Sequence, residues 1–446
     1  MVEAKRPFGT GFVRLVAVLA FAYLLLLPVS QGTILLGVFS LMALAALLTY
    51  TQTKRVIPIP IAVIVLLTLL LGAFGLAVGS RHEDVFNYAG TYIGAPLLFF
   101  FCVGAMGQET IRILLKTGAI VTVISGAFIL IYVGGQEGIL PKIFPPALLE
   151  LTGAGYGVQD GVSAVRFYGL STLAAAGPMW LASLFVRTDA LLPNIRLRAL
   201  AAAMGIAGAA VGGRRAIILT LVLIPLVAWA VKRATTKRRT GPTTINPGYV
   251  IAGLVLGLAA IFLARRLIAM PVVIDTWRAA STFFAGPGSD ISADDAIRNY
   301  QADRLLGAWT ESPVWGHGFG ATMAGYLREG FLPSRFELQY HALLMQTGII
   351  GALIVLAIAV IAWRAAVKAA ASRPDLLPSL IVTVCAGAAM LIANATNPYL
   401  QAPAHMWAIF LPLAVINMML REPRADSDVV VVLPAVRTSS ARYLKV

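Results

Sequence analysis

The sequence predicts an all-α integral membrane protein, and three features of the chain carry that prediction. Hydrophobic residues make up 59% of its 446 residues and charged residues only 12%, whereas a soluble domain has about 25% charged residues. Apolar runs of roughly 20 residues, the length that a helix needs to cross a bilayer, recur along the whole chain. Basic residues gather between alternate runs, as they do in multi-span proteins. A soluble fold is therefore excluded.

The apolar runs predict about twelve membrane-spanning helices. We expect them at 12–29, 32–50, 57–79, 88–106, 114–134, 166–186, 197–213, 215–231, 249–268, 341–363, 377–395 and 405–420. The run from 199 to 231 is too long for one helix, so it is divided into two short helices that meet at Gly212-Gly213-Arg214-Arg215. One polytopic domain over 1–421 follows, with a polar tail over 422–446 that we expect to be disordered.

The basic residues also orient the predicted helices. An even number of spans puts both termini on the same side. If that side is the cytoplasm, about two thirds of the 35 lysines and arginines lie in cytoplasmic segments, in agreement with the positive-inside rule. The opposite orientation breaks the rule at nearly every loop. Topology thus explains the formal charge of +15, and no nucleic-acid partner is expected.

The longest hydrophilic connection, residues 265–340, falls on the outer side in this orientation. Most connections have about 4–6 residues, and much longer ones are functional or disordered. This loop contains several tryptophans, a helix-like stretch at Asp294–Glu311 and the turn Gly316-His317-Gly318-Phe319-Gly320. We therefore expect a folded, mostly helical loop inserted between the ninth and tenth spans.

Arg214 and Arg215 are the first candidates for a binding site, because they interrupt an apolar run near the outer surface. Burying an arginine at membrane depth costs about 2.5–17 kcal/mol depending on the method, and such residues normally have a function. Two guanidinium groups beside a helix N-terminus suit a phosphate or diphosphate. The alternative is that one of them extends to the lipid headgroups.

Three further arginines on the outer side are candidate ligands of the same anion. Arg166 is expected to open the sixth span, where anchoring to headgroups is the alternative role. Arg298 and Arg304 are six residues apart on the expected helix and do not share one face. One of them can meet a ligand while the other pairs with a nearby acid, for which the candidates are Asp294, Asp295, Asp303 and Glu311.

His341 is the candidate general base. It lies where the long loop returns to the membrane, at the N-terminal end of a span, and such a position favours the neutral imidazole that accepts protons. A structural histidine at the interface is the alternative. His317, between two glycines, is expected to be a loop residue. The four histidines have no metal-ligand spacing, and Cys102 and Cys385 lie in apolar runs, so we expect buried thiols and no metal site.

Four segments of the chain together resemble the O-antigen ligase family, which is related to the O-antigen polymerases. The segments are Arg166-Phe-Tyr-Gly-Leu, Arg215-Ala-Ile-Ile-Leu219, Arg298 followed by Pro313 and Gly316-His-Gly-Phe-Gly320, and Tyr340-His341-Ala-Leu-Leu-Met-Gln-Thr-Gly-Ile-Ile-Gly351. Two positions depart from the family pattern. Ala342 stands where the family has asparagine, and Ala-Ala-Gly-Pro178 replaces its His-Pro-Asn.

The resemblance implies a membrane fold similar to the GT-C glycosyltransferases and an inverting, metal-independent transfer without a cofactor. The donor would be O-antigen glycan on undecaprenyl diphosphate, and the acceptor a sugar hydroxyl of lipid A–core. It implies that Arg215, with Arg214, Arg298, Arg166 and Arg304, holds the diphosphate while His341 takes the acceptor proton. The site would face the periplasm from a Gram-negative inner membrane, with cytoplasmic termini and membrane lipids around the bundle.

Two other functions remain open from the sequence. A polymerase would use the same donor but join it to a second lipid-linked glycan, so it shares these residues. A transporter of lipid-linked glycan would place polar groups through the full depth of the membrane. In this chain the polar groups concentrate at the outer ends of the spans, which favours a transferase.

Overall fold

The computed structural model of the protein describes residues 10–29, 32–52, 57–159, 162–212, 215–235, 293–323 and 334–422. This part of the chain is mostly helical, and seven of its helices are long and apolar enough to cross a membrane. They are α2 (Gly32–Gln52), α3 (Ile59–Val78), the α4–α5 unit (Val85–Ala105), α6 (Gln108–Gln136), α14 (Gln339–Ser372), the unit ending in α15 (Pro374–Ala393) and the unit ending in α16 (Pro403–Arg421). The composition and these helices are typical of a membrane-embedded protein.

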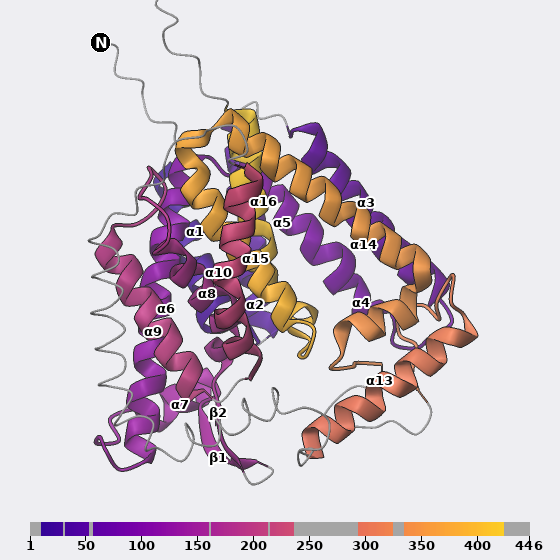
Figure 1. The fold of residues 1–446 in the computed structure, drawn as a ribbon, viewed down its shortest axis with the longest axis horizontal. Coiled ribbons are helices and arrows are strands. Elements are labelled where there is room, and N and C mark those ends of the chain that lie inside the picture. The colour runs from indigo at the N-terminus through magenta and orange to yellow at the C-terminus, as the bar shows by residue number, and fades with distance from the viewer. Residues whose placement is uncertain are drawn as a thin grey trace, which may run out of the picture.

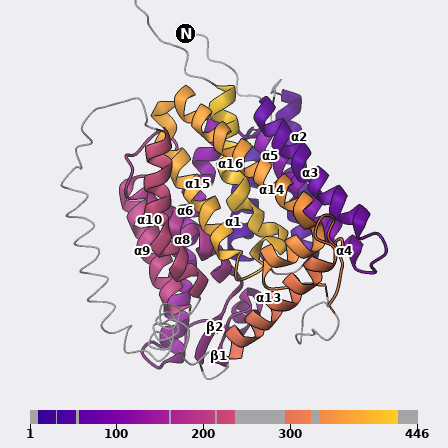
Figure 2. The same ribbon diagram turned by 45° about the vertical axis from the view of Figure 1, so that its right-hand side comes forward.

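The helices pack around one central core (Figures 1 and 2). The shorter helices of the bundle are α1 (Thr10–Leu26), α8 (Leu173–Ser183), α9 (Ile195–Val211) and α10 (Arg215–Thr235). α8 contacts both α9 and α15, and α6 contacts α9. Trp180 of α8 is fully buried, and its indole nitrogen donates a hydrogen bond to the Thr122 hydroxyl at 3.1 Å. The core therefore consists of apolar helix faces and a few satisfied polar groups.

The two ends of the bundle differ in what they carry. In Figure 1 the lower end carries α7 (Pro146–Thr152), the strands β1 and β2, and α13 (Ala293–Glu311). We call it the outer end, following the orientation that the basic residues predict. The opposite end, where α1 begins and α16 finishes, is the inner end.

Helices cover most of the predicted spans, with bounds that shift by a few residues. The run 199–231 is divided as expected, because α9 ends at Val211 and α10 begins at Arg215. The span expected at 249–268 lies outside the described residues, as do most of the loop before Ala293 and the tail after Glu422. The total of twelve crossings therefore stays a prediction.

The expectation for residues 166–186 is wrong in its first part, and the described fold is not purely helical. β1 (Gly155–Gln159) and β2 (Val162–Arg166) form an antiparallel hairpin in which Gly155 lies opposite Arg166. The β-branched residues at both ends of the Val162–Val165 stretch favour extended backbone. Helix begins only with a 3₁₀ turn at Tyr168–Thr172, and α8 follows with 11 residues, or about 16 Å. That length is roughly half of a hydrocarbon core.

The expected glycine turn is present and fills a break in α14. α14 is kinked at Gly348, which has a φ of 59° and a ψ of −162°. A kink leaves backbone carbonyls of the preceding turn without their helical partners. Here the N–H of His317 donates to the carbonyl of Met345 at 2.9 Å, and the N–H of Gly318 donates to that of Gln346 at 2.8 Å. The turn thus completes the hydrogen bonding of the kinked helix.

Glycine is required at this turn for two reasons. Gly316, Gly318 and Gly320 have φ values of 72°, 86° and 84°, a region that other residues rarely adopt. A Cβ on Gly318 would also lie 2.1 Å from the backbone nitrogen of Gly79 at the end of α3. The turn therefore joins α3 to α14 by direct backbone contact.

Candidate functional site

The first turn of α14 is held in place by α13. Leu305 of α13 packs with Phe336, Ala342 and Met345 in one small buried cluster. The side-chain oxygen of Gln301 accepts a hydrogen bond from the N–H of Leu338, just before α14, at 2.9 Å. A helix within the long outer loop thus fixes where α14 begins.

His341 lies in this first turn, where the backbone N–H groups give a helix partial positive charge. Its ring is half-buried. The Nδ1 atom is buried and has no hydrogen-bond partner among the residues that the structure describes. Because buried polar groups are almost always paired, this unpaired ring nitrogen is an exception that the described part of the fold does not account for.

The other histidines are used to hold the fold. The Nε2 atom of His82 lies 2.8 Å from the carbonyl oxygen of His317, and the Nε2 atom of His317 lies 2.7 Å from that of Ala308. His405 is buried, with Nε2 at 2.6 Å from the Ser171 hydroxyl and Nδ1 at 2.9 Å from a backbone carbonyl. The expectation that His317 is a loop residue is confirmed, and its contact gives it a structural role.

Arg298 forms an ion pair, but with a residue that the sequence did not indicate. Its Nε atom lies 3.4 Å from an Oε atom of Glu337, and neither side chain is fully exposed. Glu337 is not among the four acids that the sequence offered as partners of Arg298 or Arg304. Glu337 lies close to Arg298 because its neighbour Phe336 packs against α13. The pair therefore brings the Arg298 guanidinium to Glu337, a residue that lies four positions before His341 in the chain.

Arg304 lies on the same helix but points to solvent, 5.9 Å from the centroid of the Tyr300 ring. Arg166 ends β2 and is exposed, so it does not open a helix as expected. Arg215 is the first residue of α10, and the placement of its side chain lies outside the description. Arg214 lies outside the described residues altogether.

The outer end of α15 (Leu377–Ala393) connects the regions around these candidates. The Tyr340 hydroxyl, one residue before His341, donates to the carbonyl of Leu391 at 2.6 Å. Ala393, two residues further on, packs in a cluster with Val165 of β2 and Val211 at the end of α9. The chain neighbours of His341, of Arg166 and of the Arg214-Arg215 turn thus meet around the same end of one helix.

A set of polar and aromatic groups below α14 was not anticipated from the sequence. The amide of Gln339 donates to the Tyr92 hydroxyl at 2.9 Å, and that of Gln346 donates to the Tyr88 hydroxyl at 3.4 Å. Both tyrosine rings stack on Phe319 of the glycine turn. The sequence signal that could have revealed this set is residue spacing. Two glutamines seven residues apart lie on one face of α14, and two tyrosines four residues apart lie on one face of the α4–α5 unit. These contacts fix the rotation of α14 and therefore the direction of His341.

The arrangement suits an anion and a proton transfer. Guanidinium groups and a helix N-terminus stabilise negative charge, and an imidazole exchanges protons near neutral pH. Within the described ranges there is no group of three or more His, Cys, Asp or Glu side chains that could hold a metal ion. The described residues therefore offer acid–base and electrostatic chemistry at the outer end.

Comparison with known proteins adds no relative: no protein-family model matches the chain, and no curated protein matches it significantly. The similarity to the O-antigen ligases rests on the four short segments alone. The fold and the candidate site define a multi-helix, membrane-embedded protein with arginines at one end of the bundle and, at the same end, a histidine whose Nδ1 atom has no partner among the described residues.

Proposed function

We propose that the protein is an O-antigen ligase that transfers glycan from undecaprenyl diphosphate to a sugar hydroxyl of lipid A–core. The observation that carries the proposal is the meeting of three separate chain segments around the outer end of α15. Tyr340 contacts Leu391, and Ala393 packs with Val165 and Val211. Each of these segments borders one of the family-like motifs, at Tyr340-His341, Arg166 and Arg215.

The proposed reaction is a single displacement. The acceptor oxygen attacks the anomeric carbon, the bond from that carbon to the diphosphate oxygen breaks, and undecaprenyl diphosphate leaves with both electrons. Attack from the face opposite the leaving group inverts the anomeric configuration. His341 takes the proton of the acceptor hydroxyl, a role for which general bases contribute about 10²- to 10⁴-fold in rate.

The arginines stabilise the leaving group in this proposal. A lipid diphosphate is already a good leaving group, so catalysis needs cations on its oxygens more than a strong acid. Arg215 begins a helix, and the helix N-terminus adds partial positive charge beside its guanidinium. Arg298 is on the helix that positions α14, with Arg166 on the neighbouring hairpin.

The proposal places the protein in the inner membrane of a Gram-negative bacterium with this site facing the periplasm. The basic inner end supports that orientation, because cytoplasmic segments carry the excess of lysine and arginine. Undecaprenyl diphosphate-linked O-antigen and lipid A–core would then be its two partners.

The direct test is a reaction of purified protein with lipid-linked glycan and lipid A–core, with no nucleotide or cation added. Glycan attached to lipid A–core is the expected product, detected by its shift on gels and by mass spectrometry. The absence of that product with a folded protein contradicts the proposal. Longer lipid-linked glycan in place of glycosylated core identifies a polymerase instead.

A further inference from the structure

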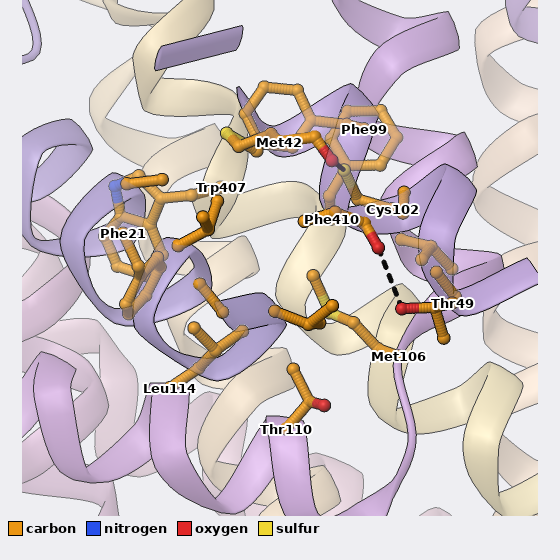
Figure 3. Close-up of a pocket in the computed structure, with 18 of the residues that line it drawn as sticks. Phe21, Met42, Thr49, Phe99, Cys102, Met106, Thr110, Leu114, Trp407 and Phe410 are labelled. Atoms are coloured by element: carbon orange, nitrogen blue, oxygen red, sulfur yellow. Dashed lines mark hydrogen bonds between the residues drawn. The ribbon is translucent and has the colours of Figure 1, made fainter. Parts of the chain in front are cut away.

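A cavity of about 90 Å³ lies among α1, α2, α5 (Ala95–Ala105), α6 and α16 (Figure 3). Val13, Thr49 and Thr110 are among the residues that line it. They lie near the start of α1, the end of α2 and the start of α6, all at the inner end. From there the cavity extends to Leu24 near the end of α1 and Trp407 at the start of α16. None of the candidate residues of the proposed transfer lines it.

The walls of the cavity are hydrocarbon. Side chains of Phe21, Leu24, Phe99, Leu114 and Phe410 are among those that face it. Two polar groups in the wall are turned to their own or a neighbouring helix, and a third, the indole nitrogen of Trp407, is buried without a hydrogen-bond partner among the described residues. The Thr49 hydroxyl donates to the carbonyl of Ala45 at 2.8 Å, and the Cys102 thiol lies 3.9 Å from that of Met42. A polar ligand would lose its hydration here without replacement, so the cavity selects an apolar one.

The cavity is separated from the surroundings by a thinly packed helix. In the most apolar stretch of α2 only 11% of the residues are buried inside the protein, whereas 83% are buried in the corresponding stretch of the unit that ends in α16. Leu41, Leu44 and Leu47 of α2 are exposed, whereas Ala45 and Ala46 line the cavity. One face of α2 thus faces the bilayer and the other faces the cavity. The inward face carries alanines, and their small side chains leave the volume of the cavity unfilled. The cavity is therefore one helix away from the lipid-facing surface of the bundle.

Basic side chains stand at the inner end of the cavity. Arg14 follows the lining residue Val13, and Arg112 lies on α6 between the lining residues Thr110 and Leu114. Glu109 lies between the two arginines, at 3.9 Å from the Arg14 guanidinium and 2.8 Å from that of Arg112. Two cations against one carboxylate leave a net positive charge at the level where an inner leaflet has its phosphates.

We propose that this cavity holds a short stretch of one fatty acyl chain of an inner-leaflet phospholipid, with the lipid phosphate at Arg14 and Arg112. The cavity is smaller than an engineered cavity of about 150 Å³ that accepts benzene, so it has room for a few methylene groups of an unbranched chain and not for a ring or a branched isoprenoid. Met42 and Met106 in its wall are flexible enough to fit such a chain. The site is independent of the proposed transferase activity.

The fluorescence of Trp407 tests the proposal, because this side chain lines the cavity and is only 3% exposed. The full-length protein is placed in vesicles of phosphatidylglycerol with brominated or ordinary acyl chains, since bromine quenches tryptophan on contact. Subtracting the emission of Trp407→Phe isolates the signal of Trp407. We expect the brominated chains to lower that signal at least twofold. Trp180, which is fully buried and is not among the residues that line the cavity, is the reference and is expected to keep its emission.

Filling the cavity separates bound lipid from lipid around the bundle. Ala46→Leu places a larger side chain into the cavity and is expected to abolish the quenching of Trp407. Ala43→Leu is the matched control on α2, because Ala43 does not line the cavity, and it keeps the quenching. If Ala46→Leu melts below the control, Ala45→Val serves as the smaller filling variant.

A second pair of variants tests the headgroup. Arg14→Gln with Arg112→Gln is expected to weaken quenching by brominated phosphatidylglycerol at least twofold while leaving quenching by brominated phosphatidylcholine nearly unchanged. An absence of quenching in the unmodified protein overturns the proposal. Equal quenching in the folded filling variant and in Ala43→Leu overturns it as well.

Discussion

The two ends of the bundle differ in one kind of arginine. Both ends have exposed arginines or arginines opposite a carboxylate, as Arg14 and Arg112 are at the inner end, but among the described residues the inner end also has arginines that hold backbone carbonyls. At the inner end, Arg421 donates to the carbonyls of Gly104 and Met106, both at 3.0 Å, and so closes the end of α5. Arg198 is fully buried and donates to the Ser183 carbonyl and the Thr188 hydroxyl. At the outer end, Arg166 and Arg304 are exposed and Arg298 meets a carboxylate.

The contrast shows how to separate structural from functional cations. A guanidinium that caps backbone carbonyls satisfies orphan groups of a helix end and is fixed by the fold. A guanidinium on the surface, or one opposite a carboxylate, can exchange its partner for another anion. The histidines divide in the same way, because His82, His317 and His405 have partners in the fold, whereas Nδ1 of His341 has none among the described residues.

The comparison of histidines gives the largest expected effect. His341→Ala should lower transfer to lipid A–core by about 10²-fold or more, the range of a lost general base. His82→Ala is the control, because it removes one hydrogen bond and should cost about 1 kcal/mol of stability with transfer retained. Initial rates and thermal melting of the purified variants check both. Normal transfer by His341→Ala would remove the distinction drawn between the histidines.

Gly318→Ala tests the structural part of the outer end. The new Cβ would lie 2.1 Å from the backbone nitrogen of Gly79, in a residue with a φ of 86°. We expect a loss of about 3 kcal/mol or more in stability, because strain and overpacking add. Gly307→Ala on α13 is the matched control, since a Cβ there meets nothing within 4 Å. Equal melting temperatures of the two variants would contradict the backbone contact between the turn and α3.

Arg215 and Arg421 form the matched pair for the arginines. Arg215→Gln should lower transfer about tenfold or more, since one stabiliser of developing charge is worth at least that much. Arg421→Gln should keep transfer but lose about 2 kcal/mol of stability, because two hydrogen bonds from a charged donor are removed. Rates, donor binding and melting temperature are measured for each. The same profile in both variants would erase the difference between the two ends.

The smallest expected effect is that of a chelator. Transfer by arginines and a histidine needs no divalent ion, so excess chelator should leave the initial rate unchanged. The reaction is run with purified protein before and after dialysis against the chelator. Loss of activity that returns with a divalent cation would replace the proposed cationic clamp by a metal mechanism.

The helices were largely predictable, and the hairpin was not. Apolar length is a local property of the sequence, so most spans were found within a few residues. The segment Val162–Arg166 is as apolar as the start of a helix, but its backbone pairs with Gly155–Gln159. Hydropathy does not distinguish a strand from a helix over five residues. The sequence also gave no sign of Glu337 as the partner of Arg298, because that contact depends on how α13 packs on α14.

The sequence by itself determined that this is a multi-helix, membrane-embedded protein, and it predicts the orientation of the bundle and the residue types on the outer side. These properties follow from the hydropathy and charge of local segments, and they do not depend on how the helices pack. Only the tertiary structure showed which histidines form hydrogen bonds within the fold and which arginines close helix ends. It also showed that α14 is kinked around a glycine turn. Those outcomes depend on partners far apart in the chain, whose approach is set by packing between helices rather than by any one segment.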